Sequence, residues 1–248
     1  MALVGREPPA QAGLFDGSRA APAPFTVKVN GRARRLTVRV YPGGRVVVTV
    51  PRGTAPLTVE RFVSRHRAWI DAKVDAARLG AGPVLPPAVI RLGCFDEDWQ
   101  VHYDPVARPG FRVRYPGRIE IGGPPDDEAG RLVALRRWLV DEGERRLGPW
   151  LRRVADERGF DFRRTQIRRQ RTRWGSCSRS GTISLNACLL FQAPDVVRYL
   201  FLHELCHTRH MNHSPRFWAL VAAHEPRWRE LDRALTRGWQ HVPGWVYD

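Results

Sequence analysis

Half of the eight histidines in this chain stand close together, in the stretch YLFLHELCHTRHMNHSPRFW at residues 199–218. His203 and His207 are four residues apart, so a helix would turn both imidazole rings onto one face, about 6 Å apart along its axis. Two converging imidazoles can share a metal ion, and Glu204 can reach a water at that ion as a general base. The spacing predicts a metal-dependent hydrolase site of the HExxH type.

Zinc is the metal that this donor set favours, because catalytic zinc sites combine three protein ligands with one position left for water. His210 would lie about 10.5 Å along the axis from His203, too far to share an ion. His213 can reach the ion only if the helix ends first, and Asn212 tolerates the left-handed backbone that such a reversal needs. We therefore expect one Zn2+ per chain with His213 as third ligand, and Glu225 as its rival.

An alternative interpretation treats the four histidines as ordinary helix residues. Against it, the preceding VVRYLFL would bury this helix, and buried ionisable groups without a metal or a partner are unfavourable. Cys206 is rotated 100° away from the ligand face, so we expect it to be a small buried residue rather than a ligand.

The composition indicates a cytoplasmic protein with reduced thiols. The four cysteines have neither the density nor the spacing of a disulfide scaffold. The N-terminus lacks the basic start and the continuous apolar run of a signal peptide, and no stretch approaches the roughly 20 apolar residues of a membrane span. We expect no membrane contact.

The formal net charge of +16 raises the question of nucleic-acid binding. Lys28 and Lys73 are the two lysines, and the arginines that supply the rest occur along the whole chain, as a general compositional bias would produce. Nucleic-acid binding is therefore not expected to be the main function, although the arginine-rich surface leaves contact with nucleic acid open.

Residues 1–24 are rich in Ala, Pro and Gly, and we expect a disordered leader. Residues 25–125 are expected to form a β-rich region with one amphipathic helix at 58–79. Three strands before that helix should form a β-meander with Asn30–Gly31 as its first hairpin turn. Three more strands are predicted after it, in DWQVHY, FRVRY and RIEIGG.

Residues 126–248 are expected to form the catalytic domain. A long helix is predicted at 128–158, with Gly148–Pro149 as the position of a kink. Two strands, RTQIRRQ and GTISLNACLL, should flank a turn in RWGSCSRSG. The helix with the histidines should follow from Pro194, and a final helix should begin at Ser214–Pro215, because Ser caps helices and Pro suits their first turn.

Three motifs in this order, RTRWGSC, ISLN and HELCHTRHMNHSPRFW, resemble the YgjP-like metal-dependent hydrolases, which are zincin-type proteins related to SprT-like and Wss1-like metalloproteases. The resemblance covers most of residues 25–240 and is strongest from Arg171 to Trp218. It implies an α+β fold with a zincin-like metallopeptidase core and an N-terminal β-rich region. The site residues that it implies are the zinc ligands His203, His207 and His213 and the catalytic base Glu204.

These features predict a zinc metallopeptidase that cleaves peptide bonds by Glu204-assisted attack of zinc-bound water. In such a core, an exposed edge of the strand in GTISLNACLL would hold an extended peptide or protein substrate. Arg173 and Asn186 are candidates for substrate or oxyanion contacts, with structural pairing as the alternative for both.

Two other functions use the same residues. A nucleotide phosphoanhydride hydrolase would clamp phosphates with Arg169, Arg171 and Arg173, but the sequence has no glycine-rich phosphate loop. A nucleic-acid-associated binding module would use zinc structurally, but Glu204 beside an open coordination position argues against a closed site.

Overall fold

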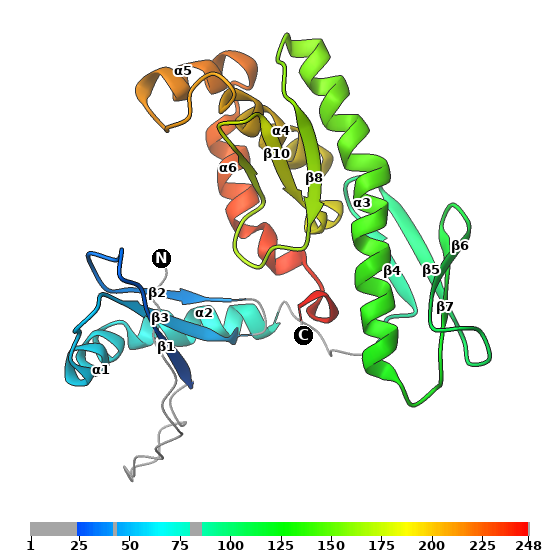
Figure 1. The fold of residues 1–248 in the computed structure, drawn as a ribbon, viewed down its shortest axis with the longest axis horizontal. Helices are drawn as coiled ribbons and strands as arrows, with labels where there is room; N and C mark the ends of the chain where they lie inside the picture. Colours follow the sequence, from blue (N-terminus) through cyan, green and yellow to red (C-terminus); the bar gives the residue numbers. More distant parts are fainter. Residues whose placement is uncertain (1–23, 42–43, 80–85, 248) are drawn as a thin grey trace. The chain divides into compact units, whose positions relative to one another are not determined.

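The computed structural model describes residues 24–41, 44–79 and 86–247 (Figure 1). Contacts divide the described residues into two compact units, one of residues up to 79 together with Tyr247 and the other of residues 86–246. This division falls at a different place from the start expected for the catalytic domain at residue 126, and the limits of that domain stay a prediction. The expected disordered leader lies, except for Pro24, outside the described residues. None of the described helices is long and apolar enough to cross a membrane.

The first unit contains a three-stranded sheet of β1 (Phe25–Val29), β2 (Thr37–Val40) and β3 (Val46–Val50). The strand order is β1-β3-β2, with β1 parallel and β2 antiparallel to β3. The predicted β-meander is therefore wrong, because Asn30–Gly31 does not connect two paired strands. The apolar run of β3 is buried along its whole length, which suits the central position.

Two helices follow where one was predicted, namely α1 (Pro56–Arg65) and α2 (Arg67–Leu79). The break falls at His66, whose backbone leaves helical geometry at φ −101° and ψ 11°. Its Nδ1 donates to the Phe62 carbonyl at 2.8 Å. The valines on one face of the sheet pack against both helices, in a cluster of Val38, Val46, Val48, Val50, Val59, Val63, Ile70 and Val74.

The second unit begins with a four-stranded sheet in the order β4-β5-β7-β6. Its strands are β4 (Val89–Leu92), β5 (Glu97–Asp104), β6 (Gly110–Tyr115) and β7 (Arg118–Gly122). The three predicted strands are confirmed as β5, β6 and β7, whereas β4 was not predicted.

The long helix α3 (Glu128–Arg158) has the predicted limits and retains Pro149 in its interior. Asp127 caps its start by accepting from the Gly130 N–H at 2.8 Å. Gly159 ends it in a left-handed conformation at φ 67°. Because α3 contacts both the four-stranded sheet and the sheet beside the histidines, it is the scaffold of the unit.

The third sheet contains β8 (Arg164–Arg168), β9 (Gly175–Cys177) and β10 (Thr182–Asn186), in the order β8-β10-β9. The strand predicted over GTISLNACLL ends at Asn186 and continues as the 3-10 helix η2 (Ala187–Phe191). The expected exposed edge on this strand is also wrong, because β10 pairs on both sides. The two edge strands are β8 and β9, and β9 contacts the histidine helix.

Three α-helices complete the chain, α4 (Pro194–Cys206), α5 (Pro215–His224) and α6 (Trp228–Arg237), followed by the short 3-10 helices η3 (Gly238–His241) and η4 (Gly244–Val246). The start predicted at Ser214–Pro215 is confirmed, but α5 is not the final helix. Helices and mixed sheets together make an α+β fold, as expected. The four cysteines are free, and Cys206 is buried as predicted.

A cluster of charges joins α3 to β5. Arg146 donates twice to Glu97, at 2.6 and 2.7 Å, and once to Glu142 at 3.3 Å. The Glu142 side chain is only 2% exposed, and its burial raises the pKa of its carboxyl although Arg145 and Arg146 oppose this. The hydrogen bonds from Arg146 lower the pKa of Glu97. Arg146 thus bridges two carboxylates in the scaffold, and Arg145 also pairs with Glu142.

Replacing Arg146 by Ala is expected to reduce the free energy of unfolding by about 2–3 kcal/mol, because Glu142 loses a charged partner in a buried position. The Glu97 part of this stabilisation is present above pH 4.5, the ordinary pKa of that carboxyl, and is lost as the pH falls through its lowered value. Urea unfolding at pH 7 and pH 3 measures both effects. Arg153→Ala, at an exposed position of the same helix, is the control, and an equal loss in both variants would contradict the prediction.

Candidate metal centre

Helix α4 carries the HExxH residues on a buried scaffold. Pro194 and Asp195 occupy its first turn, and most of its apolar side chains are in the core. His203 and His207 lie on one face, with ring centroids 5.0 Å apart. The helix ends at Cys206, with His207 as its C-cap residue. Burial of the other faces therefore fixes the direction in which the two rings point.

The chain reverses directly after α4 and brings back His213. Backbone hydrogen bonds from Thr208 to Leu205 and from His210 to Cys206 form the turn. Asn212 does not adopt the expected left-handed conformation. Among the residues that the structure describes, Asp96 is the only one other than glycine with a positive φ. The helix ends before His213, as a role for His213 as third ligand requires, but through turn hydrogen bonds instead of a left-handed residue.

The three histidine side chains converge on one point. The Nε2 atoms of His203 and His213 are 3.1 Å apart, and the ligand atoms of the three residues all lie within 4.8 Å of one another. Glu225, the rival ligand, is not in this group. It lies at the end of α5 and accepts from the Arg227 N–H.

The donor set fits a divalent cation such as zinc. Burial, with smaller contributions from His207 and His213, lowers the pKa of His203 to about 3, and burial also lowers the pKa of His207. Both rings are therefore neutral near pH 7, which is the form that binds metal. Two ring nitrogens 3.1 Å apart, without a carboxylate in their group, suit a shared cation better than two adjacent protons.

Neighbouring groups contact the imidazole rings of His203 and His207. The His207 Nδ1 lies 3.0 Å from the carbonyl of His210, which can only accept, so this nitrogen carries the proton and Nε2 keeps its lone pair. Tyr199 donates to Asp232 at 2.9 Å, and its oxygen lies 3.5 Å from the Nδ1 of His203. Tyr199 and Asp232 belong to α4 and α6, and no spacing in the sequence identified them.

Helix α5 supplies aromatic walls for the imidazoles. Phe217 stacks on His207 with centroids 4.4 Å apart, and Trp218 stacks on His213 at 5.5 Å. Ser214 caps this helix and accepts from the Phe217 N–H. The predicted helix start thus places two aromatic rings against the imidazoles of His207 and His213.

Glu204 lines a hollow together with His203 and has an unused carboxyl oxygen. Its side chain is 4% exposed, and Oε2 has no hydrogen-bond partner in the described structure. Burial raises the pKa of Glu204 to about 8, opposed by the positive charge of Arg173 and a hydrogen bond from the backbone of Cys177. A buried carboxyl group with a free oxygen is suited to exchanging a proton with a group in the site.

Strand β9 contacts this carboxyl group through a glycine. A Cβ atom at Gly175 would lie 2.7 Å from the Glu204 Oε1, closer than side chains tolerate. Only glycine therefore lets β9 approach the carboxyl group without displacing it. The turn in RWGSC was predicted to lie at the cleft, but this steric role was not foreseen.

A hollow of about 350 Å³ opens next to Glu204. Apolar side chains from three elements form its walls, and Trp174 stacks on Trp239 with centroids 4.1 Å apart. Ionisable residues also line it, namely Arg173, His203, Glu204 and Asp232. The space adjoins both the proposed base and one proposed ligand, so it can receive part of a substrate.

The two candidates for substrate contact differ in position. Arg173 is exposed and lines the hollow, so it stays a candidate. Asn186 is fully buried, and its amide donates to the carbonyls of Gln170 and Arg173 at 2.6 and 2.8 Å. Because these bonds use both amide hydrogens, Asn186 supports the loop before β9 and has no donor left for an oxyanion.

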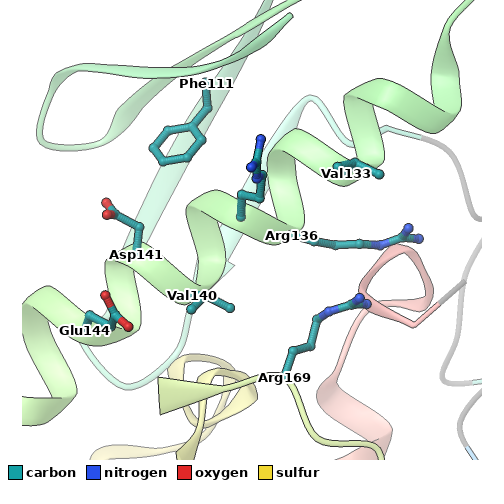
Figure 2. A pocket seen from close by; sticks show the side chains of 8 residues that line it. Phe111, Val133, Arg136, Val140, Asp141, Glu144 and Arg169 are labelled. Carbon is teal, nitrogen blue, oxygen red and sulfur yellow. The ribbon is translucent and has the colours of Figure 1, made fainter. Parts of the chain in front are cut away.

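Another hollow lies between α3 and β6 (Figure 2). None of the three histidines lines it. Arg136 and Arg169 point from its rim toward the C-terminal segment, where they donate to the carbonyls of Trp245 and Val246. These arginines therefore hold the C-terminal segment in place, and Arg169 is not among the residues that line the hollow next to Glu204.

The family model described as YgjP-like, metallopeptidase domain, matches residues 34–238. Among solved structures, the chain is similar to the crystal structure of the metallopeptidase zymogen of Pyrococcus abyssi abylysin. The two are 29% identical over 35% of this chain and 90% of that chain, with a TM-score of 0.32. The curated proteins contain no match.

The His213→Ala variant is expected to lose bound metal, because it removes one of three converging donors. Elemental analysis of purified wild type should find one zinc per chain, and the variant should bind at least tenfold more weakly, an effect at the level seen for ligand-supporting groups. His210→Ala is the matched control, since the side chain of His210 is outside the cluster. Equal metal content in wild type and His213→Ala would contradict the assignment.

Proposed function

Because the chain belongs to the YgjP-like metallopeptidase family, and so is a metal-dependent peptidase, we propose that it is a zinc enzyme with Glu204 as its general base. The observation that carries this proposal is the placement of Glu204. Its buried carboxyl group has one free oxygen and lines the same hollow as His203, one of the three converging histidines. This arrangement supports water-dependent cleavage of peptide bonds.

His203, His207 and His213 would hold the ion, with His207 binding through Nε2 because Nδ1 is used by the His210 carbonyl. Zinc would supply Lewis acidity, which makes water a stronger nucleophile and polarises the peptide carbonyl. The aromatic rings of Phe217 and Trp218 limit rotation of the imidazoles. Rigid ligands favour a fixed reaction geometry.

Glu204 would take a proton from the attacking water on Oε2 and later give it to the leaving amine. The pKa of about 8 that burial gives this carboxyl is close to neutral pH, so both transfers are accessible. The positive charge of Arg173 favours the ionised form that accepts the first proton. Arg173 also lines the hollow, where it can contact a substrate carbonyl.

The substrate would bind in extended form along β9. This strand is at the edge of its sheet and contacts α4, so its outer backbone groups lie near the proposed base. A substrate side chain would enter the hollow between Trp174 and Asp232. A nucleotide is less well supported, because Arg169 is bound to a C-terminal carbonyl and cannot join Arg173 in a phosphate clamp.

Replacing Glu204 by Gln keeps the shape of the side chain but removes the basic oxygen. Turnover of an unfolded protein substrate is expected to fall at least 100-fold, while zinc content stays within error of wild type. The two readouts are hydrolysis kinetics and elemental analysis of the same sample. If the zinc-loaded variant keeps its activity, Glu204 does not have this role. If the variant stays inactive after zinc is added, the role is supported.

The Gly175→Ala variant tests the contact between β9 and the base. The added methyl group must displace the Glu204 carboxyl, and a shift of about 1 Å can reduce turnover by roughly 100-fold. Zinc content should not change, since no ligand is touched. Gly148→Ala is the control, because a Cβ there meets no atom within 4 Å. Similar kinetics in both variants would show that the carboxyl position is not critical.

A further inference from the structure

The net positive charge of the chain is not evenly distributed, contrary to the expectation from composition. Residues 24–79, in the first unit, contain twelve arginines and lysines but only three acidic residues. They therefore carry +9 of the net charge of +16 in less than a quarter of the chain. A general arginine bias explains a high average positive charge along the chain, but it does not explain why the charge is concentrated in one unit.

Part of this charge gathers at one end of the three-stranded sheet. The Asn30 N–H donates to the Val50 carbonyl at 2.9 Å, which fixes the loop after β1 to the end of β3. The Arg52 side chain lies beside this loop, with Nε 3.5 Å from the Cβ position at Gly31. The cluster, called the basic end below, comprises Lys28, Arg32, Arg34, Arg35 and Arg52, all exposed.

No carboxylate pairs with these five side chains in the part of the unit that the structure describes. The acidic residues Glu60, Asp71 and Asp75 all belong to α1 and α2, and the ion pair found there joins Asp71 to Arg67. In the second unit, by contrast, arginines such as Arg146 and Arg227 bind carboxylates. The basic end is thus a concentration of like charge without internal compensation.

Clustered like charges repel one another and do not contribute to folding, so their concentration indicates an anionic partner. Exposed arginines without an enclosing pocket bind a single anion weakly, but they bind a densely charged polymer through release of its counterions. Four of the five cations are arginines, whose planar guanidinium groups pair with two phosphate oxygens. We propose that the basic end binds the phosphate backbone of nucleic acid.

A lipid surface is a poorer partner for this cluster. Residues 30–35 read NGRARR and contain no large apolar side chain to enter a membrane. Binding to phosphates requires no particular base sequence, so the interaction is expected to be independent of sequence and sensitive to salt. This proposal concerns a different unit from the histidine cluster and does not depend on the peptidase function.

The test is a fluorescence anisotropy titration of the full chain with a labelled DNA duplex of about 20 base pairs, between 50 and 200 mM salt. Wild type is expected to bind in the micromolar range and to weaken as salt rises. The variant R32E/R34E/R52E should bind at least tenfold more weakly. The slope of log affinity against log salt should also fall by about three, since each lost phosphate contact removes about 0.9.

The matched control is R108E/R118E/R153E, which makes the same change in net charge at exposed arginines of the second unit. Its affinity should remain within about threefold of wild type. The variant R32Q/R34Q/R52Q controls for a folding defect caused by the introduced glutamates. It must also lower the slope of log affinity against log salt. The proposal is overturned if both Glu variants lose affinity equally, if wild type does not bind, or if polyglutamate or anionic vesicles compete better than unlabelled DNA.

Discussion

The buried carboxyl group of Glu204 is the constraint that the surrounding elements must satisfy. Glu204 is only 4% exposed, and one of its carboxyl oxygens has no hydrogen-bond partner in the described structure. Burying such an oxygen is unfavourable, so the elements around it must hold the carboxyl group in place. The backbone of Cys177 contacts it from β9, and Gly175 allows that strand to come close. Strand β9 pairs with β10, and Asn186 of β10 donates to two carbonyls of the loop before β9. The third sheet therefore determines where the carboxyl group lies.

The imidazoles depend on where α4 ends. Its last turn presents His203 and His207, and the turn after it returns His213 to within 3.1 Å of the first ring. The His210 carbonyl contacts the Nδ1 of His207, and Tyr199, which is bonded to Asp232, lies 3.5 Å from the Nδ1 of His203, so both rings are contacted on the Nδ1 side. The site therefore needs α5 and α6 as well as the motif, because these helices supply the stacking rings and Asp232.

The sequence predicted the parts of the site that are close in the chain. Spacing alone placed His203, Glu204 and His207, and the cap signal at Ser214 located the helix that supports His213. Long-range pairing was less accessible, because alternating residues predict a strand but not its neighbours. The parallel pairing of β1 with β3 and the central place of β10 were missed for this reason. The overall composition gives only the total charge. The unequal charge of the two units is seen only when the residues are grouped by unit.

Zinc X-ray absorption spectroscopy on the purified wild type tests the central claim most directly, because it identifies the atoms that surround the metal. The account predicts scattering from three imidazole rings at about 2.0–2.1 Å, with one further light ligand and no sulfur. A sulfur shell at about 2.3 Å would contradict it, since Cys177 or Cys206 would then replace a histidine. A closed site of four protein ligands would also contradict it, because water would have no position beside Glu204.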